Sequence, residues 1–135
     1  MTSQKPRRIT EKELIEISAR KKRKTPYPAP TAPDLINHTV HYAGGTEFLR
    51  LLINFQPMYE KYGVKLTLQM QKADGSNGLT YKVDHYISRD EAAAHEIELE
   101  VTTSIFNPAN HATVSITYLP VEEESSLPLE LTLAN

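Results

Sequence analysis

Apolar and polar residues alternate in four consecutive stretches between residues 64 and 118, and this period of two constrains the fold more than any other feature. The stretches cover residues 64–71, 79–87, 97–105 and 113–118. Such alternation is typical of antiparallel strands with one face on a core and the other in water. In the second stretch the expected core-facing side chains are Leu79, Tyr81, Val83, His85 and Ile87. Asp-Gly and Asn-Gly pairs between the first two stretches predict a tight turn.

The chain before these stretches has a longer period. Between Thr46 and Tyr62, apolar residues recur at spacings of three and four, which predicts an amphipathic helix that ends at Gly63. Pro57 lies inside this segment and predicts a kink or a break. A looser alternation over residues 35–42 predicts one further strand.

A short helical turn is expected between the second and third stretches, where Ser88 and Glu91 have the spacing of a capping box. Together these elements predict an α+β fold. It consists of a single antiparallel sheet of four to five strands, in the order β-α-β-β-β-β, packed on one main helix and preceded by a basic N-terminal arm.

Charge is divided unevenly along the chain. Residues 1–24 hold nine of the 15 Lys and Arg residues and three of the 17 Asp and Glu residues, which gives +6 there, −8 elsewhere and −2 overall. Such asymmetry is a hint of binding to nucleic acid or to an acidic partner. The residues expected to contact nucleic-acid phosphates are Arg7, Arg8, Arg20, Lys21, Lys22, Arg23 and Lys24. The same clusters also have the spacing of a bipartite nuclear-import signal, and a solvated tail is the third alternative.

Composition divides the chain into four parts. Residues 1–24 are the basic arm, with a marginal helix over about residues 11–23. Residues 25–33 contain four prolines and predict an extended spacer between arm and body. Residues 34–121 are the α+β domain, and residues 122–135 are an acidic, leucine-alternating tail.

Leucines recur at every second position of the tail, an unusual pattern for a disordered segment. They are Leu127, Leu129, Leu131 and Leu133. Three alternatives follow: an edge strand within the same chain, a strand added to a partner or a second copy, or disorder. The second alternative makes these leucines candidate partner-contacting residues.

The sequence predicts no catalytic residue, metal site or cofactor. Cysteine is absent, and the five histidines lack the spacing of a known metal motif. An acid–base pocket under the sheet would use His85, Tyr81, Tyr118 and Asp84, but Asp84 and His85 point to opposite faces of a regular strand. Glu98 and Glu100 share a face, and we expect them to form a solvated charge ladder near Lys65 and Lys82.

These observations predict a small non-catalytic accessory protein. Its body would recognise a protein or form a homodimer, and its arm would contact nucleic acid with low specificity. Two alternatives stay open: an interaction module or inhibitor whose arm binds an acidic protein, and a small-ligand or enzymatic pocket. We expect an intracellular, cytoplasmic protein, nuclear in a eukaryotic or viral host, because no stretch approaches the ~20 apolar residues of a membrane span and no signal peptide is recognisable.

Overall fold

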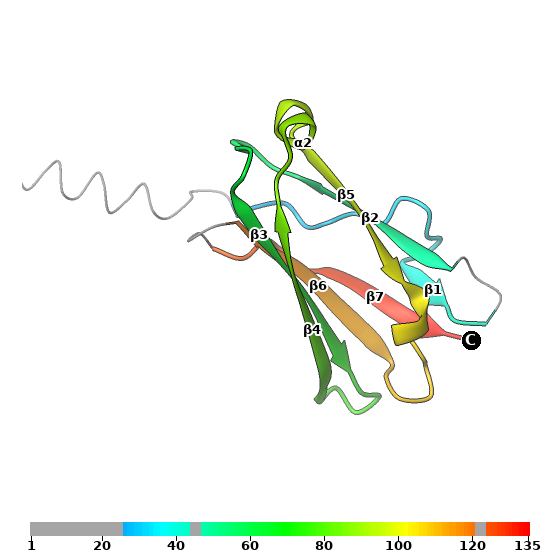
Figure 1. Cartoon of the computed structure of the whole chain (residues 1–135). Coiled ribbons are helices and arrows are strands. Elements are labelled where there is room, and N and C mark those ends of the chain that lie inside the picture. Colours follow the sequence, from blue (N-terminus) through cyan, green and yellow to red (C-terminus); the bar gives the residue numbers. More distant parts are fainter. Residues whose placement is uncertain (1–25, 44–46, 121–123) are drawn as a thin grey trace, which may run out of the picture.

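The computed structural model describes residues 26–43, 47–120 and 124–135, which fold predominantly into strands (Figure 1). The strands are β1 (Thr39–His41), β2 (Phe48–Asn54), β3 (Gly63–Gln71), β4 (Asn77–Tyr86), β5 (Glu96–Thr102), β6 (Thr113–Pro120) and β7 (Leu129–Ala134). A short helix α2 (Arg89–Ala94) connects β4 to β5, and a 3-10 turn (Thr103–Ile105) follows β5. The described residues include no helix long and apolar enough to cross a membrane.

The strands form two sheets that pack face to face. One sheet has five strands in the order β1-β7-β6-β3-β4, and the other pairs β2 with β5. Side chains from both sheets fill one hydrophobic core, as in a β-sandwich. The predicted single sheet is therefore wrong, because β5 leaves the larger sheet and pairs antiparallel with β2 in a second layer.

The predicted main helix over residues 46–62 is also wrong, since residues 48–54 form β2. Every second side chain of β2 is buried, at Leu49, Leu51 and Ile53. Leu51 lies opposite Leu99 and Ile53 opposite Ile97, so β5 supplies apolar cross-strand neighbours that no local pattern shows. Gly63, expected to end the helix, instead begins β3. The α+β class holds only in the coarse sense of many strands with a single short helix among the described residues.

The other strand predictions are confirmed within a few residues, as is the capped turn before β5. The backbone N–H of Glu91 donates to Ser88 Oγ at 3.2 Å, and the Ser88 N–H donates to Glu91 Oε1 at 2.8 Å. The strand expected over residues 35–42 is shorter than predicted. Asn37 and His38 have φ angles of 54° and 50°, and this left-handed backbone interrupts an extended chain.

The proline-containing segment is part of the body as far as it is described. Tyr27 is 1% exposed, and its ring centroid lies 5.5 Å from that of Phe55 and 6.2 Å from that of Tyr118. Thr31 pairs with Leu52 of β2 through two backbone hydrogen bonds of 2.9 and 2.8 Å. Residues 26–33 therefore pack on the body, whereas the predicted spacer would extend away from it.

The tail adds a strand to its own sheet. β7 pairs antiparallel with β6 and parallel with β1, so both of its edges are occupied within the chain. Leu129, Leu131 and Leu133 are buried, whereas Leu127 precedes the strand and is half exposed. Of the three alternatives for these leucines, the structure has the intramolecular strand, although in an inner rather than an edge position.

The predicted core face of β4 is largely solvated, unlike that of β3 beside it. Leu79 and Val83 are 58% and 49% exposed, although they lie on the same face as the buried Leu66 and Leu68. The reason is the position of β4 as the last strand of the five-stranded sheet. The smaller sheet has two strands and is too narrow to cover all five.

Candidate nucleic-acid interface

The chain enters the body at a fixed point. All seven basic residues expected to contact phosphates, Arg7, Arg8 and Arg20 to Lys24, lie outside the described residues, as does the helix expected over residues 11–23. Among the described residues, the first buried side chain is that of Tyr27, and the Tyr27 backbone carbonyl accepts a 2.9 Å hydrogen bond from the Leu127 N–H. The end of the sandwich around Tyr27 is therefore where the basic arm is attached.

This end of the sandwich carries exposed tyrosines. Tyr59 and Tyr62 are 58% and 55% exposed, and their ring centroids lie 5.6 Å apart at an interplanar angle of 49°. Both line a hollow of about 100 Å³ together with Tyr27, Phe55 and the first residues of β3. The two tyrosines and the attachment point of the arm thus border the same depression.

The loop that carries these tyrosines is held by backbone hydrogen bonds to the start of the α2 connection. The Lys61 N–H donates to the Ile87 carbonyl at 2.7 Å, and the Ile87 N–H donates to the Tyr62 carbonyl at 2.9 Å. Tyr86, opposite Gly63 on β4, is 70% exposed. Exposed aromatic faces in a fixed loop are suited to stacking against planar groups such as nucleobases.

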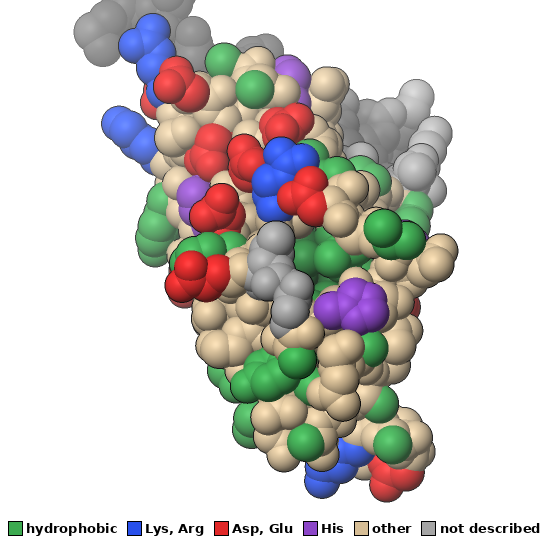
Figure 2. Space-filling model, turned by 90° about the vertical axis from the view of Figure 1, so that its right-hand side faces the viewer, with side chains coloured by type: hydrophobic (Ala, Val, Ile, Leu, Met, Phe, Trp, Pro, Cys, Tyr) green, Lys and Arg blue, Asp and Glu red, His purple; other side chains and the backbone are tan. Residues whose placement is uncertain are grey.

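Acidic side chains gather on a different element. Glu96, Glu98 and Glu100 alternate along β5, and Figure 2 shows acidic side chains around a basic one on this side of the molecule. Arg50 of β2 donates to Glu98 Oε1 at 3.1 Å and to Asp34 Oδ2 at 3.2 Å. The hydrogen bond to Glu98 and the charge of Asp34 raise the pKa of Arg50.

The expectation that Glu98 and Glu100 lie near Lys65 and Lys82 is wrong, because β5 pairs with β2. Glu98 and Glu100 lie opposite β2, with Arg50 facing Glu100, because β5 belongs to the smaller sheet. Lys65 and Lys82 lie on β3 and β4 of the larger sheet. The charge ladder is therefore an acidic face with Arg50 as its partner.

The residues considered for acid–base chemistry are not brought together. Tyr118 is buried in the core, with its hydroxyl donating to the Asn54 carbonyl at 3.4 Å, and Asp84 lies opposite Lys65 in the sheet. His85 Nε2 is 2.8 Å from Glu91 Oε1. Burial alone would raise the pKa of Glu91, but hydrogen bonds from the Ser88 N–H and His85 outweigh it and lower that pKa. The His85–Glu91 pair thus fastens α2 to β4.

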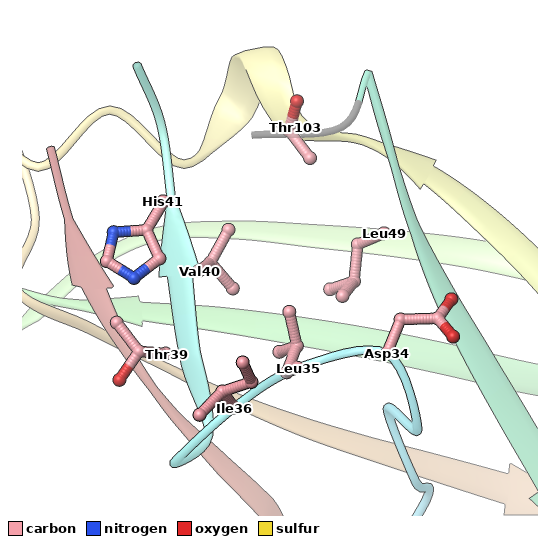
Figure 3. Close-up of a pocket in the computed structure, with 8 residues that line it drawn as sticks. All are labelled: Asp34, Leu35, Ile36, Thr39, Val40, His41, Leu49 and Thr103. Atoms are coloured by element: carbon pink, nitrogen blue, oxygen red, sulfur yellow. The ribbon is translucent and has the colours of Figure 1, made fainter. Parts of the chain in front are cut away.

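A second cavity, of about 210 Å³, lies between β1 and β2 and has mainly apolar walls. Figure 3 shows Leu35, Val40 and Leu49 facing one another, whereas the His41 ring lies on the other side of β1 and the Asp34 carboxylate turns away. His41 Nδ1 lies 3.2 Å from the Asn135 carbonyl, and Asp34 binds Arg50. The polar groups at this cavity therefore have partners elsewhere and do not converge on a common point.

The histidines are dispersed over separate elements. His111 is buried, and its Nε2 accepts the Leu79 N–H at 3.3 Å, while His38 and His95 lie in left-handed turns. In the part of the chain that the structure describes, no three His, Asp or Glu side chains gather closely enough to hold a metal ion.

Sequence reasoning missed the tyrosine-bearing end. The spacing of three between Tyr59 and Tyr62 fits the apolar face of the helix expected up to Tyr62, but both tyrosines lie in the connection between β2 and β3. The signal that favours a loop is Pro57 and Gly63 on either side of them. Comparison with protein-family models, curated proteins and solved structures finds no match for this chain.

Proposed function

We propose that this protein is a small non-catalytic accessory protein that binds nucleic acid through its basic arm and the tyrosine-bearing end of its body. The arm supplies phosphate contacts, and Tyr59 and Tyr62 supply a surface on which unpaired bases stack. The body also serves protein recognition or dimerisation. We propose that it acts inside the cell, in the cytoplasm or, in a eukaryotic or viral host, in the nucleus.

The observation that carries the proposal is the position of the exposed tyrosine pair beside the attachment point of the arm. Tyr27 lines the same hollow as Tyr59 and Tyr62. Two residues, Thr25 and Pro26, separate Lys24 from Tyr27, so the Cα atoms of Lys24 and Tyr27 lie at most about 11 Å apart. The most basic run of the sequence therefore joins the body next to its exposed aromatic rings.

Charge and stacking are the two ingredients of single-strand binding without sequence preference. Arg and Lys side chains release counterions from the phosphates, so affinity falls steeply with salt. Tyrosine rings accept any base because every base has a π-face. The glutamates of β5 repel phosphates, so they favour binding at the tyrosine-bearing end over binding at their own face.

The test is binding of the full chain to a labelled single strand and to a duplex of equal length, measured by fluorescence anisotropy across a salt series. Replacing Lys21, Lys22, Arg23 and Lys24 together by Ala should lower the salt slope on the single strand by about three, at ~0.7 per lost phosphate contact. The double variant Tyr59→Ala, Tyr62→Ala should weaken single-strand binding by ~1–3 kcal/mol per base lost from the stack, with the slope unchanged.

The matched control is Tyr42→Ala, an exposed tyrosine next to β1, outside the hollow that Tyr59 and Tyr62 share. It should leave both affinity and slope as they are. If the tyrosine double variant binds the single strand like the wild type, stacking is excluded from the mechanism. If the wild type shows no salt-dependent binding to either probe, the nucleic-acid function is overturned.

The main alternative assigns the arm to an acidic protein or to nuclear import. An acidic polypeptide such as polyglutamate, added as a competitor, separates the two. It should displace the single strand only at a large excess if the tyrosines contribute to binding, because a carboxylate chain has no rings to stack. Equal affinity for polyglutamate and for the single strand would favour the alternative.

A further inference from the structure

The two sheets have four edges within the described part of the chain, and three of them are protected. β1 is three residues long, and the outer edge of β2 is occupied at Leu52 by backbone pairing with Thr31. β5 carries a glutamate at positions 96, 98 and 100. If two copies of β5 paired antiparallel with their polar faces on the same side of the sheet, glutamates would lie opposite glutamates and repel each other. Short strands, covered edges and repulsive charge are the usual ways in which proteins prevent edge pairing.

The fourth edge, β4, has none of these protections. It is ten residues long, contains no proline, and in the described part of the chain pairs with β3 alone. Its core-facing side presents Leu79 and Val83, which are about half exposed, with Tyr81 and His85 partly buried between and beside them. A long, unpaired edge with an apolar face is a template for pairing with another strand.

The sequence of β4 is complementary to itself in one antiparallel register. Symmetry about Val83 places Lys82 of each copy opposite Asp84 of the other, and both side chains are exposed. Symmetry about Lys82 or about Asp84 places like charges opposite each other, and symmetry about Tyr81 gives no ion pair. On the apolar face, the Val83 register brings the two valines together and sets Tyr81 opposite His85.

We propose that β4 pairs antiparallel with β4 of a second copy of this chain, with the two-fold axis at Val83, so that one continuous sheet runs through both bodies. Two-fold pairing is the commonest symmetry of homo-oligomers, and it uses the same patch on both subunits. The inference rests on the dimerisation part of the proposed function, and the tests of the dimer use no nucleic acid. In the dimer, two basic arms belong to one particle, which raises avidity for a long single strand.

The first test is the oligomeric state of the full chain without nucleic acid, by sedimentation across a concentration series. The wild type should dimerise in a concentration-dependent manner. Lys82→Glu creates repulsion with Asp84 of the other copy and should weaken the dimer roughly tenfold or more. The double variant Lys82→Glu, Asp84→Lys restores opposite charges and should recover most of the loss.

The matched control for this series is Lys72→Glu, the same charge change at an exposed residue of the turn between β3 and β4. It should leave the dissociation constant unchanged, and thermal unfolding verifies that every variant is folded. A wild type that stays monomeric at all concentrations overturns the proposal. The apolar face of β4 would then be a surface for the arm or for another protein. A dimer that is insensitive to Lys82→Glu overturns it as well.

A second test fixes the register, because the wild type contains no cysteine. Directly opposite residues of antiparallel strands have Cα atoms about 4.5–5.5 Å apart, within reach of a disulfide. Under mild oxidation Val83→Cys should therefore form a covalent dimer, while Leu79→Cys, similarly exposed but off the axis, should not. Cross-linking at position 79 or 81 in place of 83 overturns the register, and failure of single-strand binding in the same preparations affects only the proposed function.

Discussion

Strands β7 and β4 lie in the same sheet and have similar alternating sequences, yet their apolar side chains differ in burial. In β7 the leucines at every second position are buried, with Leu131 at 1% exposure. In β4 the corresponding apolar positions include Leu79 and Val83, which are about half exposed. β7 lies between β1 and β6, whereas β4 is the last strand of the sheet.

The difference shows that alternation predicts a strand and which of its side chains share a face. Alternation does not predict how deeply that face is buried. Depth depends on whether a second layer covers that part of the sheet. Here a two-stranded layer covers a five-stranded sheet, so an outer strand keeps an apolar face without a cover from the described residues. An uncovered apolar face in a folded chain is a candidate surface for association.

The largest effect should separate the two strands directly. Leu131→Ala removes a fully buried side chain from β7 and should lower the free energy of unfolding by ~2–5 kcal/mol. Leu79→Ala makes the same chemical change on β4 and should alter it by no more than ~0.5 kcal/mol, measured below the concentration at which copies associate. Urea unfolding of both variants checks this, and equal losses would mean that β4 is buried in solution.

An intermediate effect is expected where β4 meets the core. A Cβ added at Gly78 would overlap with the His111 ring, whose Nε2 accepts the Leu79 N–H. Gly78→Ala should therefore destabilise the fold by ~1–3 kcal/mol. In a His111→Ala background the same change should cost much less, because the obstructing ring is gone. Additive losses in urea unfolding would contradict this account of the contact.

The smallest effect concerns α2, which joins β4 to β5. The pKa of Glu91 is lower in the folded chain than its ordinary value of 4.5, because the Ser88 N–H and His85 together outweigh the cost of burial. Its contribution to stability is therefore complete above pH 4.5 and is lost as the pH falls through the folded pKa. Glu91→Gln should flatten the decline in unfolding free energy as the pH falls below 4.5.

Asp74 provides the comparison for this pH series, since the Ser76 hydroxyl and N–H lower its pKa in the turn at the other end of β4. Asp74→Asn should remove a separate part of the same decline. A Glu91→Gln variant with the full wild-type slope would show that the carboxylates responsible lie elsewhere.

The strands were predictable from the sequence because their information is local. The alternation in β3 to β6 and the capping box from Ser88 to Glu91 are read directly from neighbouring residues. The main helix was wrong because Leu49, Leu52 and Phe55 satisfy a helical spacing, while β2 is fixed by pairing with β5, more than 40 residues away. Non-local pairing of this kind decides between two periods that the local sequence leaves ambiguous.

The sequence predicted the basic residues of the candidate site, but not the exposed tyrosines beside the attachment point of the arm. The basic residues are visible in composition alone, and their role stays a prediction because they lie outside the described residues. The tyrosine pair required knowledge of which segment is a loop and where Tyr27 enters the core. The order of strands in the sheet, which exposes β4, depends on contacts between distant segments and is not written in any single motif.

The parallel pairing of β1 with β7 has a mechanical consequence. The two strands run in the same direction, one reached from the N-terminal side of the chain and the other leading to its C-terminal side. A pull applied between Ile36, an exposed residue just before β1, and Asn135 draws the two strands along their lengths in opposite directions. The backbone hydrogen bonds between β1 and β7 are then loaded in shear and share the force, instead of breaking one after another.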